Sequence, residues 1–238
     1  MKLGLLLLFV CCCTAFAQFG ALTDQPFVAG DSSVDQLLSF SIGYHWDYTN
    51  LSDGAVSDWI DSASGYHWTQ ASGASQPTKD SNGVTFAGSH WLDASNTIRC
   101  STAPDNLDVF LVVLKVDTFP GGTILASGNQ VDLGFDSSQW YNPAGYWGTI
   151  VTGVWIDYVY AGTTVITPYH YTNGVVAKVS DVLHSHTLSY VGRITAGTGA
   201  YFNGKVKEVI IWTNVTGFTT NQVANIHQYV TNKYGFAP

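Results

Sequence analysis

The chain has 238 residues and a formal net charge of −8, and only 11% of its residues are charged whereas 46% are hydrophobic. That apolar content is enough for a sizeable core, which excludes intrinsic disorder. The acidic balance removes the electrostatic attraction on which nucleic-acid binders and polybasic lipid-binding surfaces depend, so neither partner is expected. Glycine, tryptophan and tyrosine are abundant, and Glu208 is the only glutamate. This composition favours strands and turns and excludes an all-helical fold.

The first 17 residues have the pattern of a secretory signal peptide. Lys2 precedes an apolar run over 3–13, and small residues follow at Ala15 and Ala17. This is the arrangement that signal peptidase cleaves, so residues 1–17 are predicted to be removed and the protein to be secreted. An uncleaved anchor or a buried N-terminal strand is the alternative. No later stretch reaches 18 consecutive apolar residues, so no membrane span is expected in the remainder.

Export changes the interpretation of three other positions. Removal of residues 1–17 would leave Cys100 as the only cysteine, which excludes an internal disulfide and predicts an inert, buried thiol. Asn50 and Asn214 begin N-x-S/T sequons and become candidate glycosylation sites in an exported chain.

The rest of the chain is predicted to hold one domain, because no linker, charge block or repeat divides it. Residues 51–238 are expected to form the domain, and residues 18–50 an N-terminal arm or edge segment. Turn residues separate short apolar runs, and these predict strands in chain order at 83–86, from 91, and at 108–116, 123–125, 131–135, 148–160, 169–173, 175–179, 187–194 and 205–212.

More specific expectations concern one of these strands, one loop and one helix. The run at 108–116 is almost continuously apolar, which is typical of a central strand covered on both faces. Residues 137–146 contain Asn142-Pro143 and are predicted to form a loop. Apolar residues recur at helical spacing over 220–234, with Thr219 or Thr220 available as the cap and Gly235 as the stop.

Three stretches together resemble the concanavalin A-like lectin/glucanase superfamily, especially its laminin-G-like jelly-roll domains. They are residues 56–70 (VSDWIDSASGYHWTQ), residues 83–92 (GVTFAGSHWL) and residues 202–212 (FNGKVKEVIIW), the last followed by the predicted helix. Ala63 interrupts the first motif. The resemblance implies an all-β, two-sheet antiparallel jelly-roll sandwich with one short C-terminal helix. It also implies carbohydrate binding or adhesion.

A retaining glucanase of this superfamily would carry an E-x-D-x-(x)-E pattern, which places two carboxyl groups about 5 Å apart on one strand face. With Glu208 as the single glutamate, the pattern is absent, so Glu208 is interpreted as a structural, salt-bridged strand residue. No G-x-S-x-G elbow is present either. The protein is therefore expected not to be an enzyme. A glycosidase that uses a pair of aspartates is the less favoured alternative.

Two metal sites can be considered. His184 and His186 could bind a transition metal with His170 or Asp181 as a further ligand. The family resemblance favours calcium over that site, with Asp132, Asp136 and Asn142 as candidate oxygen ligands near the predicted loop. No cofactor is expected to be required.

The aromatic residues indicate a ligand surface. Sugars stack their C–H faces on tryptophan and tyrosine rings while nearby polar groups bind their hydroxyls. The predicted loop and the strand after it contain such groups: Trp140, Tyr141, Asn142, Tyr146, Trp147, Asp157 and Tyr158. These residues are predicted to form an exposed ligand-binding rim. Packing of the rings within the loop is the alternative.

The sequence thus favours a secreted, non-catalytic, lectin-like carbohydrate-binding or adhesion module whose partner is a polysaccharide or other glycan. The alternative is an extracellular structural subunit that assembles with itself, as a homo-oligomer or filament, through exposed edge strands.

The signal-peptide assignment leads to a direct test. The secreted protein should begin at Gln18, because the small residues at Ala15 and Ala17 place the cleavage there. N-terminal sequencing or the intact mass of the secreted form checks this. A secreted form that retains Lys2 would show that the segment is not removed.

Overall fold

The structure is a computed structural model that describes residues 37–38, 40–99, 107–118, 121–127, 130–142, 145–162, 169–179, 187–194 and 201–236. The chain divides into two units, Met1–Asp31 and Ser32–Pro238, and every described residue belongs to the second. The expected signal peptide, Cys100, Asp181, His184 and His186 lie outside the described residues.

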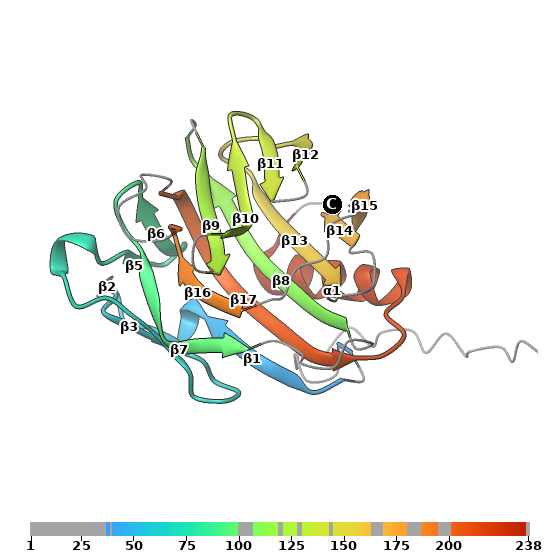
Figure 1. The fold of residues 1–238 in the computed structure, drawn as a ribbon, viewed down its shortest axis with the longest axis horizontal. Coiled ribbons are helices and arrows are strands. Elements are labelled where there is room, and N and C mark those ends of the chain that lie inside the picture. The colour runs from blue at the N-terminus through green and yellow to red at the C-terminus, as the bar shows by residue number, and fades with distance from the viewer. Residues whose placement is uncertain are drawn as a thin grey trace, which may run out of the picture. The chain divides into compact units, whose positions relative to one another are not determined.

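The described residues form two antiparallel sheets with one C-terminal α-helix, which confirms the expected all-β sandwich (Figure 1). The nine strands of the first sheet, sheet A, are in spatial order β15 (Val175–Val179), β14 (Tyr169–Thr172), β13 (Trp155–Gly162), β8 (Leu107–Val116), β17 (Asn203–Val215), β6 (Gly83–Ala87), β5 (Thr78–Asp80) and β2 (Gly54–Ala55), with β1 (Ile42–Asp47) paired to β17. The eight strands of sheet B are β12 (Gly145–Thr149), β11 (Gln139–Asn142), β10 (Gln130–Asp136), β9 (Gly122–Ser127), β16 (Thr187–Val191), β7 (Leu92–Arg99), β4 (His67–Thr69) and β3 (Asp58–Ile60).

Alternation along β8 explains how the core is divided. Phe110, Val112 and Leu114 point between the two sheets, whereas Leu111 and Val113 point to the outer face of sheet A. Because both faces of β8 are covered, its sequence is apolar at nearly every position, as expected for a central strand. At one end of the inter-sheet core the rings of Trp46 and Trp68 stack with centroids 3.9 Å apart.

The helix α1 (Thr220–Tyr234) covers the outer face of sheet A beside β8 and β13 (Figure 1). Its cap is Thr219, whose side chain accepts from the backbone N–H of Gln222 while the Gln222 side chain reaches back to Thr219. The helix stops at Gly235, which adopts the left-handed conformation with φ of 68°. The predicted helix and both of its end signals are confirmed.

Three boundaries differ from expectation. Residues 137–146 are not a loop, because β11 and β12 pair as a hairpin. The predicted strand over 148–160 is interrupted between Thr149 and Trp155. The sandwich also begins before residue 51, since β1 pairs with β17 and its alternate residues Tyr44 and Trp46 enter the core.

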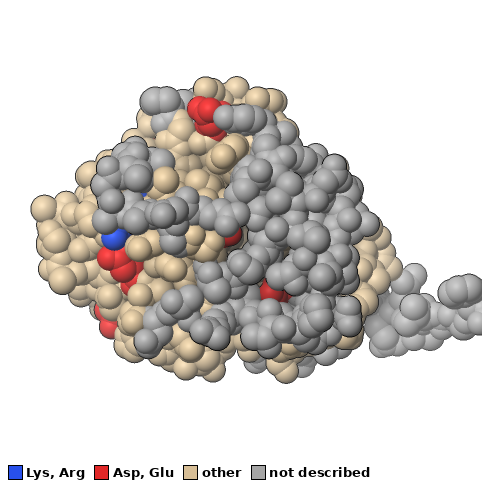
Figure 2. Space-filling view, viewed as in Figure 1, with Lys and Arg blue, Asp and Glu red and all other residues tan. Residues whose placement is uncertain are grey.

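Two short 3₁₀ helices, η2 (Tyr48–Asn50) and η3 (Gly73–Ser75), connect strands. In the described part of the chain, no helix is long and apolar enough to cross a membrane. On the face shown in Figure 2, charged side chains lie in small separate groups among uncharged residues.

Candidate functional site

The residues of the predicted aromatic rim do not share one surface. Trp140 is 1% exposed, and its ring packs 5.5 Å from that of Tyr158 in the inter-sheet core. The hairpin is the reason, since its pairing turns Trp140 inward instead of leaving it in a loop. Tyr141 is partly exposed, and the side chains of Asn142, Tyr146 and Trp147 lie outside the described part of the structure. The expected exposure of Trp140 is therefore wrong.

The two predicted ligand residues on β13 are buried as well, on opposite faces of sheet A. Asp157 is 1% exposed beneath α1, and Tyr158 lies between the sheets, where its hydroxyl group bonds to His170 Nδ1. Burial raises the pKa of Tyr158 well above its usual value. Successive strand residues point to opposite faces, so these two side chains could not have met the same ligand.

The candidate calcium ligands lie in contrasting environments. Asp136 is exposed, whereas Asp132 Oδ2 is buried without a hydrogen-bond partner and Oδ1 accepts from Ser127 Oγ at 3.3 Å. Burial raises the pKa of Asp132 to about 7, and the hydrogen bonds from Ser127 offset this only in part. Calcium binding by these residues remains an expectation.

Polar and aromatic groups gather elsewhere, where β17 meets the end of α1. Val206 pairs with Leu114 and Glu208 pairs with Val113, so Lys207 is an extra residue in the strand. Such a β-bulge lets two consecutive side chains face the same side. Lys207 and Glu208 accordingly both contact residues of the C-terminal segment on the outer face of sheet A. The sequence carried the signal in its apolar positions 206, 209 and 211, which do not alternate regularly.

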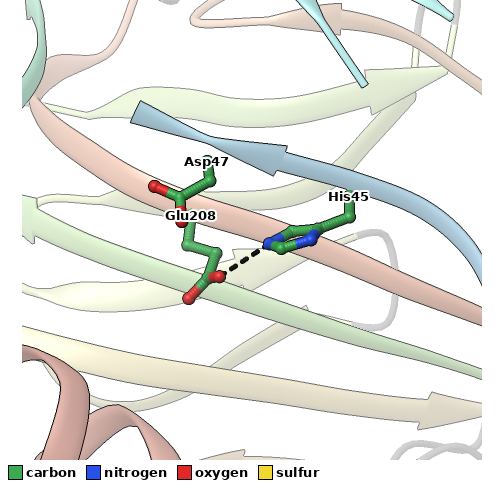
Figure 3. A group of neighbouring side chains, drawn as sticks. All are labelled: His45, Asp47 and Glu208. Carbon is green, nitrogen blue, oxygen red and sulfur yellow. Dashed lines mark hydrogen bonds and ion pairs between the residues drawn. The ribbon is translucent and has the colours of Figure 1, made fainter. Parts of the chain in front are cut away.

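Glu208 is fully buried and bonded through both carboxylate oxygens. Figure 3 shows one of these contacts, between Glu208 and His45. Oε1 lies 2.7 Å from His45 Nε2, accepts from the Tyr229 hydroxyl at 2.8 Å, and accepts from Lys233 Nζ at 2.7 Å. Oε2 accepts from the Tyr234 hydroxyl at 3.0 Å. A buried carboxylate needs this many donors to offset its lost hydration, and the expected salt bridge of Glu208 is confirmed.

Lys233 connects Glu208 to a second carboxylate. Lys233 Nζ donates to Asp47 Oδ2 at 2.7 Å, and the backbone and hydroxyl groups of Thr49 both donate to Asp47 Oδ1 at 2.8 Å. Burial by itself would raise the pKa of Asp47, but Lys233 and Thr49 hold it below its usual value. Burial and the Glu208 charge raise the pKa values of Tyr229 and Tyr234, so both phenols stay protonated and keep donating.

His45, Asp47 and Glu208 offer ligand atoms that all lie within 4.8 Å of one another, which is a donor set of the kind that binds metal ions. It also brings two carboxyl groups near the separation used by retaining glycosidases. However, Lys233 already places a cation 2.7 Å from both carboxylates, and both are buried. We therefore interpret the cluster as a closed ion-pair network that joins β1, β17 and α1.

Beside this network four partly exposed rings form a continuous row, which we call the aromatic row: Tyr48, Tyr234, Phe236 and Trp155. Successive ring centroids are 6.4, 5.7 and 5.8 Å apart. The planes of Tyr234 and Trp155 are inclined by only 26° and 12° to that of Phe236. Tyr234 belongs to both features, because its hydroxyl group is anchored on Glu208.

Lys207 lies among these rings. Its Nζ atom is 4.4 Å from the centroid of Trp155, 4.8 Å from Tyr234, 5.3 Å from Phe236 and 5.9 Å from Tyr48. These distances are within the range of cation–π attraction. Burial, with a smaller contribution from Lys205, lowers the pKa of Lys207.

A second group of polar side chains, Asp157 and His227, lies further along β13, where α1 covers the strand. Asp157 Oδ2 is 2.8 Å from Nδ1 of the partly exposed His227 ring, and Asp157 Oδ1 is buried without a partner. Burial raises the pKa of Asp157, while His227 opposes that shift. A carboxylate that orients an imidazole in this way is a proton-transfer arrangement. Trp155 is two residues away on the same face of the strand.

Sequence reasoning missed most of this surface. None of its four rings, those of Tyr48, Trp155, Tyr234 and Phe236, is among the ligand residues that the sequence predicts. They come from separate segments that only the tertiary fold brings together. The irregular spacing of apolar residues around Lys207 is the local sequence feature that indicates the bulge at this surface.

Comparisons with known proteins identify the fold. No protein-family model matches the sequence, and no curated protein matches it. The solved structures that resemble it include Trypanosoma rangeli sialidase in complex with 2,3-difluorosialic acid, with a TM-score of 0.60 and 12% identity over 83% of this chain and 34% of the sialidase. Another is domain 4 of AbnA, a GH43 extracellular arabinanase from Geobacillus stearothermophilus, in complex with arabinotriose; the TM-score is 0.51 and the identity 15%, over 79% of this chain and 99% of that domain.

These likenesses show a shared fold, and this chain spans about a third of the length of the sialidase. They also correct one expectation. Sialidases are glycoside hydrolases, so the finding contradicts the conclusion that the protein is not an enzyme. The absence of an E-x-D-x-(x)-E pattern excluded one catalytic arrangement only. The two-sheet sandwich remains compatible with the jelly-roll resemblance.

The environment of Asp132 leads to a prediction about stability and pH. Its pKa of about 7 in the folded state exceeds the usual 3.8, so the folded protein loses stability as the pH rises from about 4 to 7. The Asp132→Asn variant should not show that loss. Its free energy of unfolding relative to that of the wild type should therefore increase by about 1–3 kcal/mol between pH 5 and pH 8. Urea unfolding at both pH values measures this. Asp136→Asn, at an exposed position on the same strand, is the control; equal pH trends in all three proteins would contradict the prediction.

The Glu208 network leads to a second stability prediction. Glu208→Gln should lower the free energy of unfolding by about 3–5 kcal/mol, because it leaves buried donors facing a neutral group. Asp80→Asn is a matched control, since Asp80 also accepts from a lysine at 2.7 Å but is exposed, and should cost at most about 1 kcal/mol. Similar losses in the two variants, measured by urea unfolding, would show that the network is not a structural centre.

Proposed function

We propose that this chain is a carbohydrate-binding domain and that its ligand stacks on the aromatic row. The observation that carries the proposal is the run of four partly exposed rings with closely aligned planes at Tyr234, Phe236 and Trp155. Pyranose and furanose rings present C–H faces that pack on such surfaces, while charged and polar groups at the margin bind hydroxyl groups. Lys207, and Lys115 beside Trp155, supply such groups.

Three further considerations support this function. The AbnA domain that shares the fold was solved with arabinotriose bound, and the similar sialidase with a sialic acid derivative. The sequence resemblance to concanavalin A-like domains points to the same class of ligand. The predicted signal peptide would place the protein outside the cell, where polysaccharides are available. Within a longer or multifunctional protein, such a domain would hold the substrate of a carbohydrate-active enzyme.

Self-assembly is a second candidate function, favoured by the edge of sheet A. The edge strand β15 exposes Val175 and Val176, which are 68% and 48% exposed. Exposed apolar residues on an edge strand promote pairing with another copy. Size-exclusion chromatography with and without polysaccharide separates the candidates: ordered assemblies without glycan support self-assembly, and a monomer retarded by glycan supports carbohydrate binding.

A pair of tryptophan variants tests the location of the binding surface. Trp155→Ala should weaken binding to a polysaccharide retained by the wild type about tenfold or more, because one stacking partner is worth roughly 1–3 kcal/mol by analogy with nucleobase stacking. Trp140→Ala is the control: it should lower stability by about 3–5 kcal/mol and leave the affinity of the folded protein unchanged.

Affinity electrophoresis through gels that contain each of a panel of polysaccharides measures the binding, and urea unfolding measures the stability. Unchanged affinity in Trp155→Ala would remove the aromatic row as the binding surface. Failure of the wild type to bind any polysaccharide would contradict the proposed function itself.

A further inference from the structure

Lys207 differs from the other lysines at this surface in having no carboxylate partner. The others form ion pairs with N–O distances of 2.5 to 2.9 Å. The pairs are Lys79–Asp53, Lys115–Asp117, Lys205–Asp80, and Lys233 with both Asp47 and Glu208. Among the described residues, the Lys207 ammonium forms neither an ion pair nor a hydrogen bond, although the residue is only 9% exposed.

The neighbouring carboxylate, that of Glu208, is not available as an ion-pair partner for Lys207. Glu208 is adjacent in the chain, but its two oxygens already receive Lys233, Tyr229, Tyr234 and His45. The rings around Lys207 offset part of the cost of burying its charge through cation–π attraction. They accept none of its three N–H donors in the geometry of an ordinary hydrogen bond. The site therefore contains a largely desolvated cation whose donors are available to a ligand.

We infer that the ligand of the aromatic row is an acidic saccharide whose carboxylate pairs with Lys207, an inference that rests on the proposed function. A carboxylate on a sugar projects from the edge of the ring and leaves the C–H face free to stack. Lys207 Nζ lies 4.4 to 5.9 Å from all four ring centroids, so a sugar on any part of the row brings its edge close to the ammonium. The contact between an ammonium and a carboxylate is an ion pair as well as a charge-assisted hydrogen bond, and such bonds are shorter and stronger than those between neutral groups.

The charge distribution also limits how this ligand is held. The chain carries a net charge of −8, and the other lysines that the structure describes on this surface are paired with carboxylates. Long-range attraction of a polyanion is therefore absent, and at physiological ionic strength repulsion is screened beyond about 8 Å. Recognition depends on one short-range ion pair. The affinity should consequently fall only slightly with salt, unlike that of a polybasic surface that releases many counterions.

The test uses three carboxylated polysaccharides, polygalacturonate, alginate and polysialic acid, each beside its carboxyl-reduced form. Each pair has the same rings and linkages and differs in charge. The wild type should bind at least one acidic polymer about tenfold or more tightly than its reduced form. The polymer that shows this preference distinguishes a uronate from a sialate ligand.

Two variants assign the preference to Lys207. Lys207→Met keeps the apolar stem and removes the charge, so it should abolish the preference by lowering the affinity for the acidic polymer about tenfold or more, to a value near that for the reduced polymer. Its stability should not fall, because replacing a desolvated charge by an apolar group of similar size is often neutral or stabilising. Lys205→Met is the matched control, since it removes a lysine two residues away on the same strand, and it should keep the preference.

The outcomes separate this inference from the proposed function. Equal binding of acidic and reduced polymers, or a preference that survives Lys207→Met, overturns the inference while carbohydrate binding stands. Binding to none of the six polymers, nor to any neutral polysaccharide of the panel, overturns both.

Discussion

The carboxylate of Glu208 is the constraint on which the outer face of sheet A depends. It is the only glutamate of the chain, it is fully buried, and its four partners come from β1 and from the last turns of α1. A carboxylate without these donors would cost several kcal/mol to bury. The bulge in β17 places Glu208 on this face, because it turns the side chain toward the helix instead of toward the inter-sheet core. Local strand geometry thus determines where α1 ends against the sheet.

The same bulge organises the candidate binding surface. Because Lys207 and Glu208 face the same side, the helix end that satisfies Glu208 also surrounds Lys207 with rings. The hydroxyl group of Tyr234 donates to Glu208, which fixes the position of the Tyr234 ring. Gly235 then adopts the left-handed conformation, and Phe236 packs between Tyr234 and Trp155. Rings fixed before the ligand arrives lose little conformational entropy on binding, which favours a preorganised stacking surface.

Features with a local cause could be predicted from the sequence, and features produced by distant pairing could not. The helix, its Thr219 cap and its Gly235 stop follow from the spacing of residues within one short segment, and β8 follows from its own apolar run. The burial of Trp140 depends on β11 pairing with β12 across a turn that the sequence presents as a loop. The aromatic row requires η2, β13 and the C-terminal segment to meet, and no single-segment pattern contains that information. The irregular apolar spacing around Lys207 was the one local trace of the site.

The structure also limits where chemistry on a bound sugar could occur. Asp47 and Glu208 are close enough to suggest paired catalytic carboxyl groups, but every one of their oxygens accepts from a donor of the protein. Along β13, by contrast, Trp155 and Asp157 share a face about 7 Å apart, and Asp157 orients the partly exposed His227. A sugar stacked on Trp155 therefore lies beside a group able to move a proton. Among the described groups of this face, Asp157 and His227 are better placed than Asp47 and Glu208 to act on such a sugar, because Asp47 and Glu208 already hold the fold together.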